Sequence, residues 1–71
     1  MIGRVRWFDD EKGYGFIQDR DGNDVFVHFS DILQRGHKTL ENNQVVEYDL
    51  LDSERGAHAT NVCVLARIPQ Y

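Results

Sequence analysis

Residues 13–29 read GYGFIQDRDGNDVFVHF, which is two runs of alternating residues on either side of a polar turn. The alternation in YGFIQD and in DVFVHF is typical of β-strands, because successive side chains of a strand point to opposite faces. Between the two runs, the sequence Asp21-Gly22-Asn23 favours a hairpin turn. The stretch therefore predicts a β-hairpin that is rich in aromatic rings.

Strand alternation sorts the side chains of this hairpin into two faces. One face is aliphatic and holds Ile17, Val25 and Val27, with Phe29 in phase with the two valines. The other face holds Tyr14, Phe16, Phe26 and His28. A small barrel has one interior, and the aliphatic face is its natural lining, so the aromatic face is expected to point outward.

Burial of both faces is the alternative, because aromatic residues in strands are core residues more often than not. A second layer would then have to come from residues 30–43, which are too few and too charged to cover the aromatic face. An exposed aromatic face is therefore expected, and an exposed apolar patch marks a binding surface. Unpaired nucleobases suit such a face, since stacking on an aromatic side chain is worth about 1–3 kcal/mol per base.

The rest of the chain also has the pattern of short strands. Alternating runs occur in IGRVRWF near the N-terminus and in QVVEYDLLD and HATNVCVLA, which are joined by SERGA. Residues 30–43 have no sustained period and are expected to form a turn of helix and a long loop. Five short strands predict an all-β fold, a five-stranded antiparallel barrel that is closed or nearly closed, because closure removes exposed strand edges. The predicted domain covers residues 1–66, and residues 67–71 form a short tail.

Composition limits the classes of function. A chain of 71 residues, 41% hydrophobic and 28% charged, fits one small folded domain. Its formal net charge of −4 has the wrong sign for holding nucleic acid by bulk charge, so affinity should rest on stacking and depend weakly on salt. The single cysteine, Cys63, cannot form an internal disulfide, and no apolar run is long enough to span a membrane. Together with the lack of a signal-peptide pattern, these features favour a cytoplasmic monomer.

Both basic and acidic residues are expected near the aromatic face. A local positive rim is expected from Arg4, Arg6, Lys12 and Arg55. The alternative for each of these residues is a solvated surface side chain. The acidic residues 9–11 lie close to this rim and should weaken its attraction for a phosphate backbone.

Trp7 has two possible orientations. Strict alternation places its ring with Val5, facing the core, whereas a bulge or sharp bend between Gly3 and Phe8 would turn it outward beside the other rings. The alternation itself leaves both open.

Two motifs of the chain resemble those of a known family. KGYGFI is similar to the first ribonucleoprotein motif of the cold-shock domain, VFVHF is similar to the second, and the resemblance extends over residues 2–65. It implies a barrel of the oligonucleotide/oligosaccharide-binding type that binds single-stranded RNA or DNA, loosens RNA secondary structure without ATP and needs no cofactor. It also implies an outward Trp7. Carried over by position, the implied nucleic-acid contacts are Arg6, Trp7, Lys12, Tyr14, Phe16, Phe26, His28, Phe29, His37 and Arg55.

The sequence departs from the family pattern at several positions in its turns and loops. Asp9 stands where asparagine is usual, and His37 stands where phenylalanine or tyrosine is common. In RGAHATNV, Ala57 and His58 replace the usual proline and glutamine. In ENNQ, the turn at residues 42–43 must use asparagine where glycine is expected. These departures bear on affinity more than on function.

Two other classes of function are alternatives to nucleic-acid binding. An enzyme would need metal ligands or a nucleophile and base from His28, His37, His58 and Cys63, but their spacing matches no compact ligand motif. Cys63 lies in an alternating strand, where a buried small hydrophobic residue is the simpler interpretation. The chain is therefore not expected to be an enzyme or to hold a metal. A barrel that binds proline-rich peptide in an aromatic groove is the other alternative, and the paired motifs argue against it.

Overall fold

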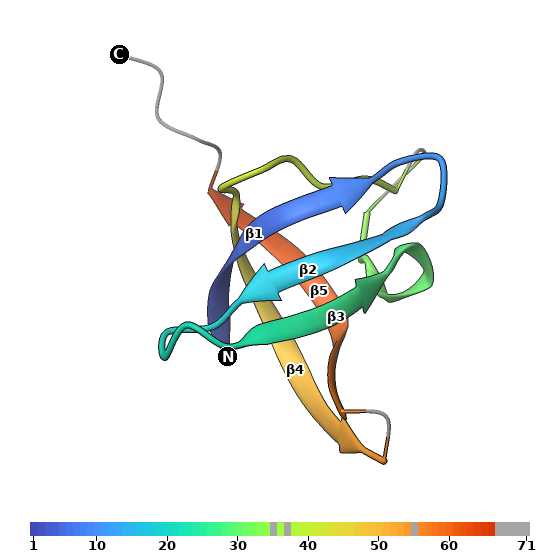
Figure 1. Ribbon diagram of the computed structural model, residues 1–71. Coiled ribbons are helices and arrows are strands. Elements are labelled where there is room, and N and C mark those ends of the chain that lie inside the picture. Colours follow the sequence, from blue (N-terminus) through green and yellow to red (C-terminus); the bar gives the residue numbers. More distant parts are fainter. Residues whose placement is uncertain (35, 37, 55, 67–71) are drawn as a thin grey trace.

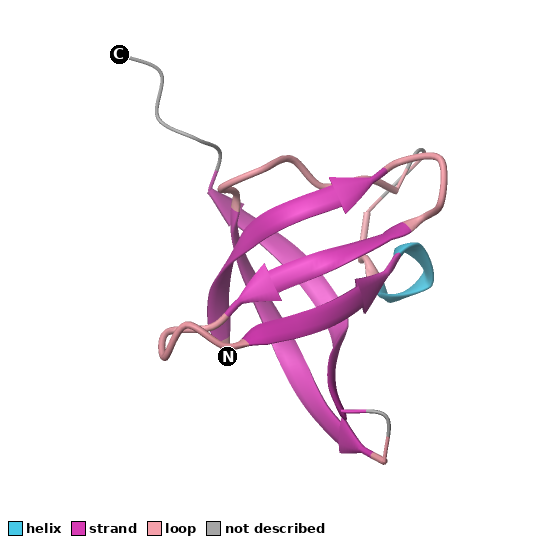
Figure 2. Ribbon diagram, in the orientation of Figure 1, coloured by secondary structure: helices cyan, strands magenta, loops and turns pink. Residues whose placement is uncertain are grey.

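A computed structural model describes residues 1–34, 36, 38–54 and 56–66 of the chain (Figure 1). The elements follow in the order β1 (Ile2–Asp9), β2 (Tyr14–Gln18), β3 (Asp24–His28), the 3-10 turn η1 (Phe29–Asp31), β4 (Val45–Ser53) and β5 (Gly56–Ala66). Strands dominate the described residues, and η1 is the short helical turn that Figure 2 draws in cyan. None of the helical structure described is long and apolar enough to cross a bilayer. The predicted all-β fold is confirmed.

The strands form a closed barrel in the order β1-β2-β3-β5-β4. Antiparallel ladders join β1 to β2, β2 to β3, β1 to β4 and β4 to β5. β3 and β5 close the barrel as a parallel pair, with Phe26 opposite His58. A parallel pair needs a long crossover, and the chain from η1 through β4 supplies it. The predicted five-stranded barrel is therefore confirmed, with one parallel ladder at its closure.

The interior of the barrel is aliphatic, as the alternation predicts. Ile17, Val25 and Val27 are each at most 1% exposed. The other core residues are Val5, Ile32, Leu40, Val46, Tyr48, Ala59 and Val62. Full burial of such an aliphatic side chain contributes about 1.5–3 kcal/mol. A slip of one residue would move the aliphatic face of β2 or β3 into solvent, so burial fixes which face of this hairpin points outward.

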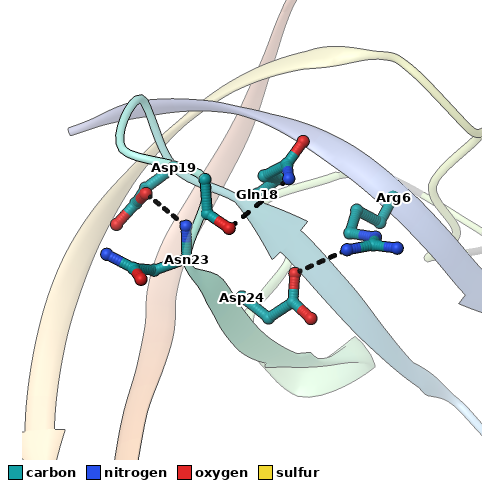
Figure 3. A network of polar contacts seen from close by, with 6 residues as sticks. Arg6, Gln18, Asp19, Asn23 and Asp24 are labelled. Atoms are coloured by element: carbon teal, nitrogen blue, oxygen red, sulfur yellow. Dashed lines mark hydrogen bonds and ion pairs between the residues drawn. The ribbon is translucent and has the colours of Figure 1, made fainter.

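The turn between β2 and β3 is organised by the carboxylate of Asp19 (Figure 3). Its Oδ1 accepts a hydrogen bond from the Asn23 backbone N–H, which Figure 3 draws, over 2.9 Å. It accepts a second from the Asp21 backbone N–H, also over 2.9 Å. Gly22 has a φ of 86°, in the left-handed region that glycine adopts without steric cost. The hairpin expected at Asp21-Gly22-Asn23 is confirmed.

Asparagine replaces glycine in the turn that precedes β4. Asn43 has a φ of 70°, and its N–H donates to the Val5 carbonyl oxygen over 2.7 Å. The buried side chain of Gln44 supports the turn, since its Oε1 accepts from the Glu41 N–H over 2.8 Å. The expectation for this turn is confirmed, and it follows from the tolerance of asparagine for left-handed backbone.

Two side chains differ from what strict alternation predicts. β3 ends at His28 and Phe29 begins η1, so the Phe29 ring leaves the face of the core valines and is 45% exposed. Cys63 is exposed, while Val62 beside it is buried. The buried position expected for Cys63 is therefore wrong. The alternation of β5 is interrupted at Asn61, which has a φ of 51°. Ala59 and Val62 are therefore both buried, and Cys63 lies on the outer face.

Tyr48 places a hydroxyl group inside the barrel. The residue is 1% exposed, and its hydroxyl oxygen has no hydrogen-bond partner among the described residues. Burial raises the pKa of this phenol, and the nearby Asp19 carboxylate raises it further. Tyr48 thus contributes a large ring to the core at the cost of an unpaired polar atom.

We expect Tyr48→Phe to raise the free energy of unfolding by up to about 1 kcal/mol at pH 7, because the ring stays and the unpaired hydroxyl is removed. The native pKa of Tyr48 lies above the unfolded value of about 10. Its contribution to stability is therefore complete below that unfolded value and is lost as the pH rises through the native pKa. Urea unfolding between pH 7 and 11 should show a smaller alkaline loss for the variant. Equal alkaline losses in the two proteins would contradict this account.

Candidate functional site

Four aromatic rings from β1, β2 and β3 form a closed cycle of contacts on the outside of the barrel. The ring centroids of Trp7 and Phe16 are 5.5 Å apart, and those of Trp7 and Tyr14 are 5.8 Å apart. Phe26 completes the cycle at 5.7 Å from Tyr14 and 5.8 Å from Phe16. We call this surface the aromatic platform and define it by Trp7, Tyr14, Phe16 and Phe26. Each ring touches two others, so the platform is held in shape before any ligand binds.

The aromatic platform is partly open to solvent. Trp7 is 40% and Phe26 is 37% exposed, while Tyr14 and Phe16 are half-buried. No described element lies over these rings as a second layer, and the aromatic face points outward as predicted. The platform is therefore available to flat ligands that can stack on it.

Trp7 reaches the platform through a β-bulge in β1. Val5 pairs with Ile17 and Trp7 pairs with Phe16, so the register between β1 and β2 shifts at Arg6. The extra residue turns Trp7 outward, and the inward orientation predicted by strict alternation is wrong. Gly15 permits this geometry, because a Cβ atom at that position would overlap the carbonyl oxygen of Trp7.

His28 and Phe29 form a second ring pair at the end of β3. Their ring centroids are 4.5 Å apart, and the Phe29 N–H donates to the Gly13 carbonyl oxygen over 2.8 Å. His28 Nδ1 lies 2.9 Å from the Ser30 hydroxyl and accepts from the Ser30 backbone N–H over 3.3 Å. An amide N–H can only donate, so the proton of a neutral His28 is on Nε2. The pair therefore offers an aromatic face together with one N–H donor.

The positive rim expected beside the platform is partly neutralised, because Arg6 pairs with an acidic residue. Arg6 Nη1 lies 3.4 Å from the Asp24 Oδ1 (Figure 3). Both side chains are about half exposed. Arg4 and Lys12 are exposed, and their positions fit either a phosphate contact or a solvated side chain. An exposed ion pair is worth at most about 1 kcal/mol, so a ligand phosphate can compete with Asp24 for Arg6.

Asp9 has a structural role that the sequence did not reveal. Its Oδ1 accepts from the N–H groups of Glu11 and Lys12, each over 3.0 Å, and its carbonyl oxygen accepts from the Gly13 N–H over 2.8 Å. The carboxylate expected to oppose a phosphate backbone thus organises the turn between β1 and β2. This turn sets the start of β2 and with it the position of Tyr14.

A groove lies beside the aromatic platform, between β3 and the β4–β5 hairpin. It has a volume of about 510 Å³ and is lined by Phe16, Phe26, Ser53, Gly56 and His58. His58 was not among the residues expected at the site. The alternation of RGAHATNV indicates only that His58 and Ala59 face opposite sides of the strand, and the pairing of His58 with Phe26 across the barrel is needed to place it at the site.

The remaining site residues are distributed as follows. The expected residues that the structure describes lie on neighbouring elements: Arg6 and Trp7 on β1, Lys12 in the turn between β1 and β2, Tyr14 and Phe16 on β2, Phe26 and His28 on β3, and Phe29 at the start of η1. His37 and Arg55 lie outside the described residues. In the described ranges, no three His, Cys, Asp or Glu side chains gather as ligands for a metal ion.

Comparison with known proteins gives consistent matches. Residues 1–65 match the family model described as the 'Cold-shock' DNA-binding domain. The chain is 58% identical over 65 residues to cold shock-like protein CspC of Bacillus cereus, with 92% of this chain and 100% of that protein covered. It is 52% identical over 63 residues to cold shock protein CspA of Staphylococcus aureus, with 89% and 96% covered.

A solved structure has the same fold. The structure named drosophila Unr CSD456 superposes with a TM-score of 0.70 at 20% sequence identity, over 92% of this chain and 26% of that one. At this identity the likeness concerns the fold alone, and it agrees with the barrel described above.

Proposed function

Because the chain belongs to the 'Cold-shock' DNA-binding domain family, whose members bind nucleic acid, we propose that it binds single-stranded RNA or DNA by stacking bases on the aromatic platform. The observation that carries the proposal is the closed cycle of four exposed or half-buried rings, with centroids 5.5–5.8 Å apart. Rings on neighbouring strands are spaced so that successive unpaired bases can stack on them.

Single strands suit this surface better than a duplex. Bases in a duplex are stacked on one another and paired, so their faces cannot reach a platform on a convex barrel. The net charge of −4 agrees with a binding mode in which stacking supplies most of the affinity. A protein of this kind traps unpaired segments, and we propose that it loosens RNA structure in the cytoplasm as a monomer, without ATP or catalysis.

The proposed contacts divide by chemistry. Stacking partners are Trp7, Tyr14, Phe16, Phe26 and Phe29. Hydrogen bonds or phosphate contacts come from Arg6, Lys12 and His28, together with His37 and Arg55, which lie outside the described residues. His28 donates through Nε2, because Nδ1 is engaged by Ser30.

Trp7 fluorescence gives a direct test, because Trp7 is the single tryptophan of the chain. We expect a pyrimidine-rich single-stranded oligonucleotide to quench the emission, since a base stacked on the platform contacts the indole. Duplex DNA of the same sequence and a proline-rich peptide serve as controls and should not quench it. Quenching by the peptide alone would overturn the proposal in favour of a peptide-binding barrel.

The ion pair between Arg6 and Asp24 leads to a prediction about salt. Asp24→Asn should release Arg6 for a ligand phosphate, so binding to single-stranded DNA should tighten. The slope of log K against log salt should become steeper by up to about 0.7, the value for one additional phosphate contact. Glu47→Gln, an exposed residue of β4, is the matched control for the change in net charge. Equal slopes for the two variants would show that Arg6 makes no additional phosphate contact.

A further inference from the structure

The row of rings on the barrel continues by one strand beyond the aromatic platform. Across the sheet, Trp7 is opposite Phe16, and Phe16 is opposite Phe26. Across the parallel ladder that closes the barrel, Phe26 is opposite His58. Side chains of directly opposed residues lie on the same face, so His58 of β5 is the next member of this row.

His58 brings hydrogen-bonding atoms to an otherwise apolar groove. The groove of about 510 Å³ is lined by the rings of Phe16 and Phe26 on one side and by Ser53, Gly56 and His58 on the other. The Ser53 hydroxyl donates its proton to the Gly56 carbonyl oxygen over 3.1 Å, so toward a ligand it can only accept. Among the described residues, neither ring nitrogen of the half-buried His58 has a hydrogen-bond partner.

The two histidines of the described site therefore differ. In His28, Nδ1 is held by Ser30, and one ring nitrogen remains for a ligand. In His58 both ring nitrogens remain, and a neutral imidazole then presents one donor and one acceptor. A pocket with aromatic walls and few convergent polar groups is the arrangement that orients a flat ligand.

We infer that His58 is a specificity-determining residue of the binding surface, which hydrogen-bonds the edge of a uracil or thymine base stacked in this groove. The inference rests on the proposed function. A uracil or thymine edge carries carbonyl acceptors on either side of an N–H donor, so it offers a partner to either nitrogen of a neutral imidazole. The imidazole N–H can donate to a carbonyl oxygen of the base, or its other nitrogen can accept from the base N–H. Stacking on the platform is indifferent to sequence, because every base has a π-face, whereas this contact reads the edge of the base.

The test combines variants of His58 with a modified oligonucleotide. Oligothymidine is titrated into the protein alongside a set in which one thymine at a time is replaced by difluorotoluene, which keeps the shape of thymine and lacks its strong hydrogen-bonding groups. For the natural protein, we expect one position at which the replacement weakens binding about 3- to 10-fold, the value of one net hydrogen bond. For His58→Ala, the replacement at that position should have no further effect.

Three further variants separate hydrogen bonding from other effects. His58→Gln keeps a donor and an acceptor and should retain part of the discrimination, whereas His58→Phe keeps a ring and should lose it. Cys63→Ala, on the exposed face of the same strand and outside the groove lining, should behave as the natural protein does. Thermal melts of all variants confirm that each is folded at the temperature of the titration.

The outcomes distinguish this inference from the proposed function. If the natural protein fails to bind oligothymidine or any other single strand, the proposed function is wrong. If it binds but no position shows coupling between difluorotoluene and His58→Ala, the binding function stands and the role of His58 is wrong. Full discrimination in His58→Phe would also overturn the role, since it would show that ring shape alone is sufficient.

Discussion

Phe16→Ala is expected to weaken binding of a single-stranded oligonucleotide by about 1–3 kcal/mol and to have little effect on the free energy of unfolding. The Phe16 ring lies at the centre of the row, in contact with Trp7 on one side and Phe26 on the other. Its removal takes away one stacking surface and also a lateral support of two others. The ring belongs to the outer face of β2 and is only half-buried, so little core packing is lost.

The neighbouring residue provides the matched control. Ile17 is fully buried on the opposite face of the same strand, and Ile17→Ala should cost about 2–5 kcal/mol of unfolding free energy. Its effect on binding should vanish once the fraction of folded protein is taken into account. A urea titration and a fluorescence titration of each variant measure the two quantities. A loss of about 3–5 kcal/mol of stability in Phe16→Ala, with unchanged binding, would place the ring in the core and contradict the site.

The contrast between these two residues shows what the alternation could determine. Ile17, Val25 and Val27 form an aliphatic set with a period of two, and a barrel has one interior, so their burial follows from the sequence. The turn at Gly22 and the turn at Asn43 follow in the same way, since few residue types adopt positive φ readily. These features are local, and each is decided by a few consecutive residues.

The features that the residue pattern could not determine depend on partners far along the chain. The bulge at Arg6 is a property of the pairing between β1 and β2, and it alone decides that Trp7 points outward. The pairing of Phe26 with His58 joins residues that lie on opposite sides of the crossover through β4. The resemblance to the cold-shock domain predicted the outward orientation of Trp7. It could not predict that His58 belongs to the binding surface, because this chain departs from the family pattern at that position.

Gly15→Ala is expected to destabilise the fold by about 3 kcal/mol, at the upper end of the range for overpacking. The added Cβ would overlap the Trp7 carbonyl oxygen and would lie 2.7 Å from the Phe8 Cα. Both atoms belong to the backbone of β1, so neither can move away by a change of rotamer. The same methyl group would also lie 3.0 Å from the Phe8 ring, which packs against the core.

Gly22→Ala separates this steric effect from the conformational cost of replacing glycine. Gly22 has positive φ but open space around it, since the nearest atom to an added Cβ would be the Gln18 Nε2 at 3.9 Å. Its replacement by alanine should cost about 1 kcal/mol, and asparagine should recover part of the loss because it tolerates left-handed backbone. Asparagine at Gly15 should give no recovery, because there the obstacle is space.

The position of Trp7 makes Gly15→Ala a test of the binding surface as well as of the barrel. The carbonyl oxygen that the new methyl group displaces belongs to the residue whose ring touches both Tyr14 and Phe16. At a temperature where the variant is folded, its tryptophan emission should therefore shift, and an oligonucleotide should quench it less than it quenches the natural protein. If Gly15→Ala instead matched the natural protein in stability, emission and quenching, the close approach of β1 and β2 at the bulge would be wrong. The outward orientation of Trp7 depends on that approach, so the aromatic platform would lose its first ring.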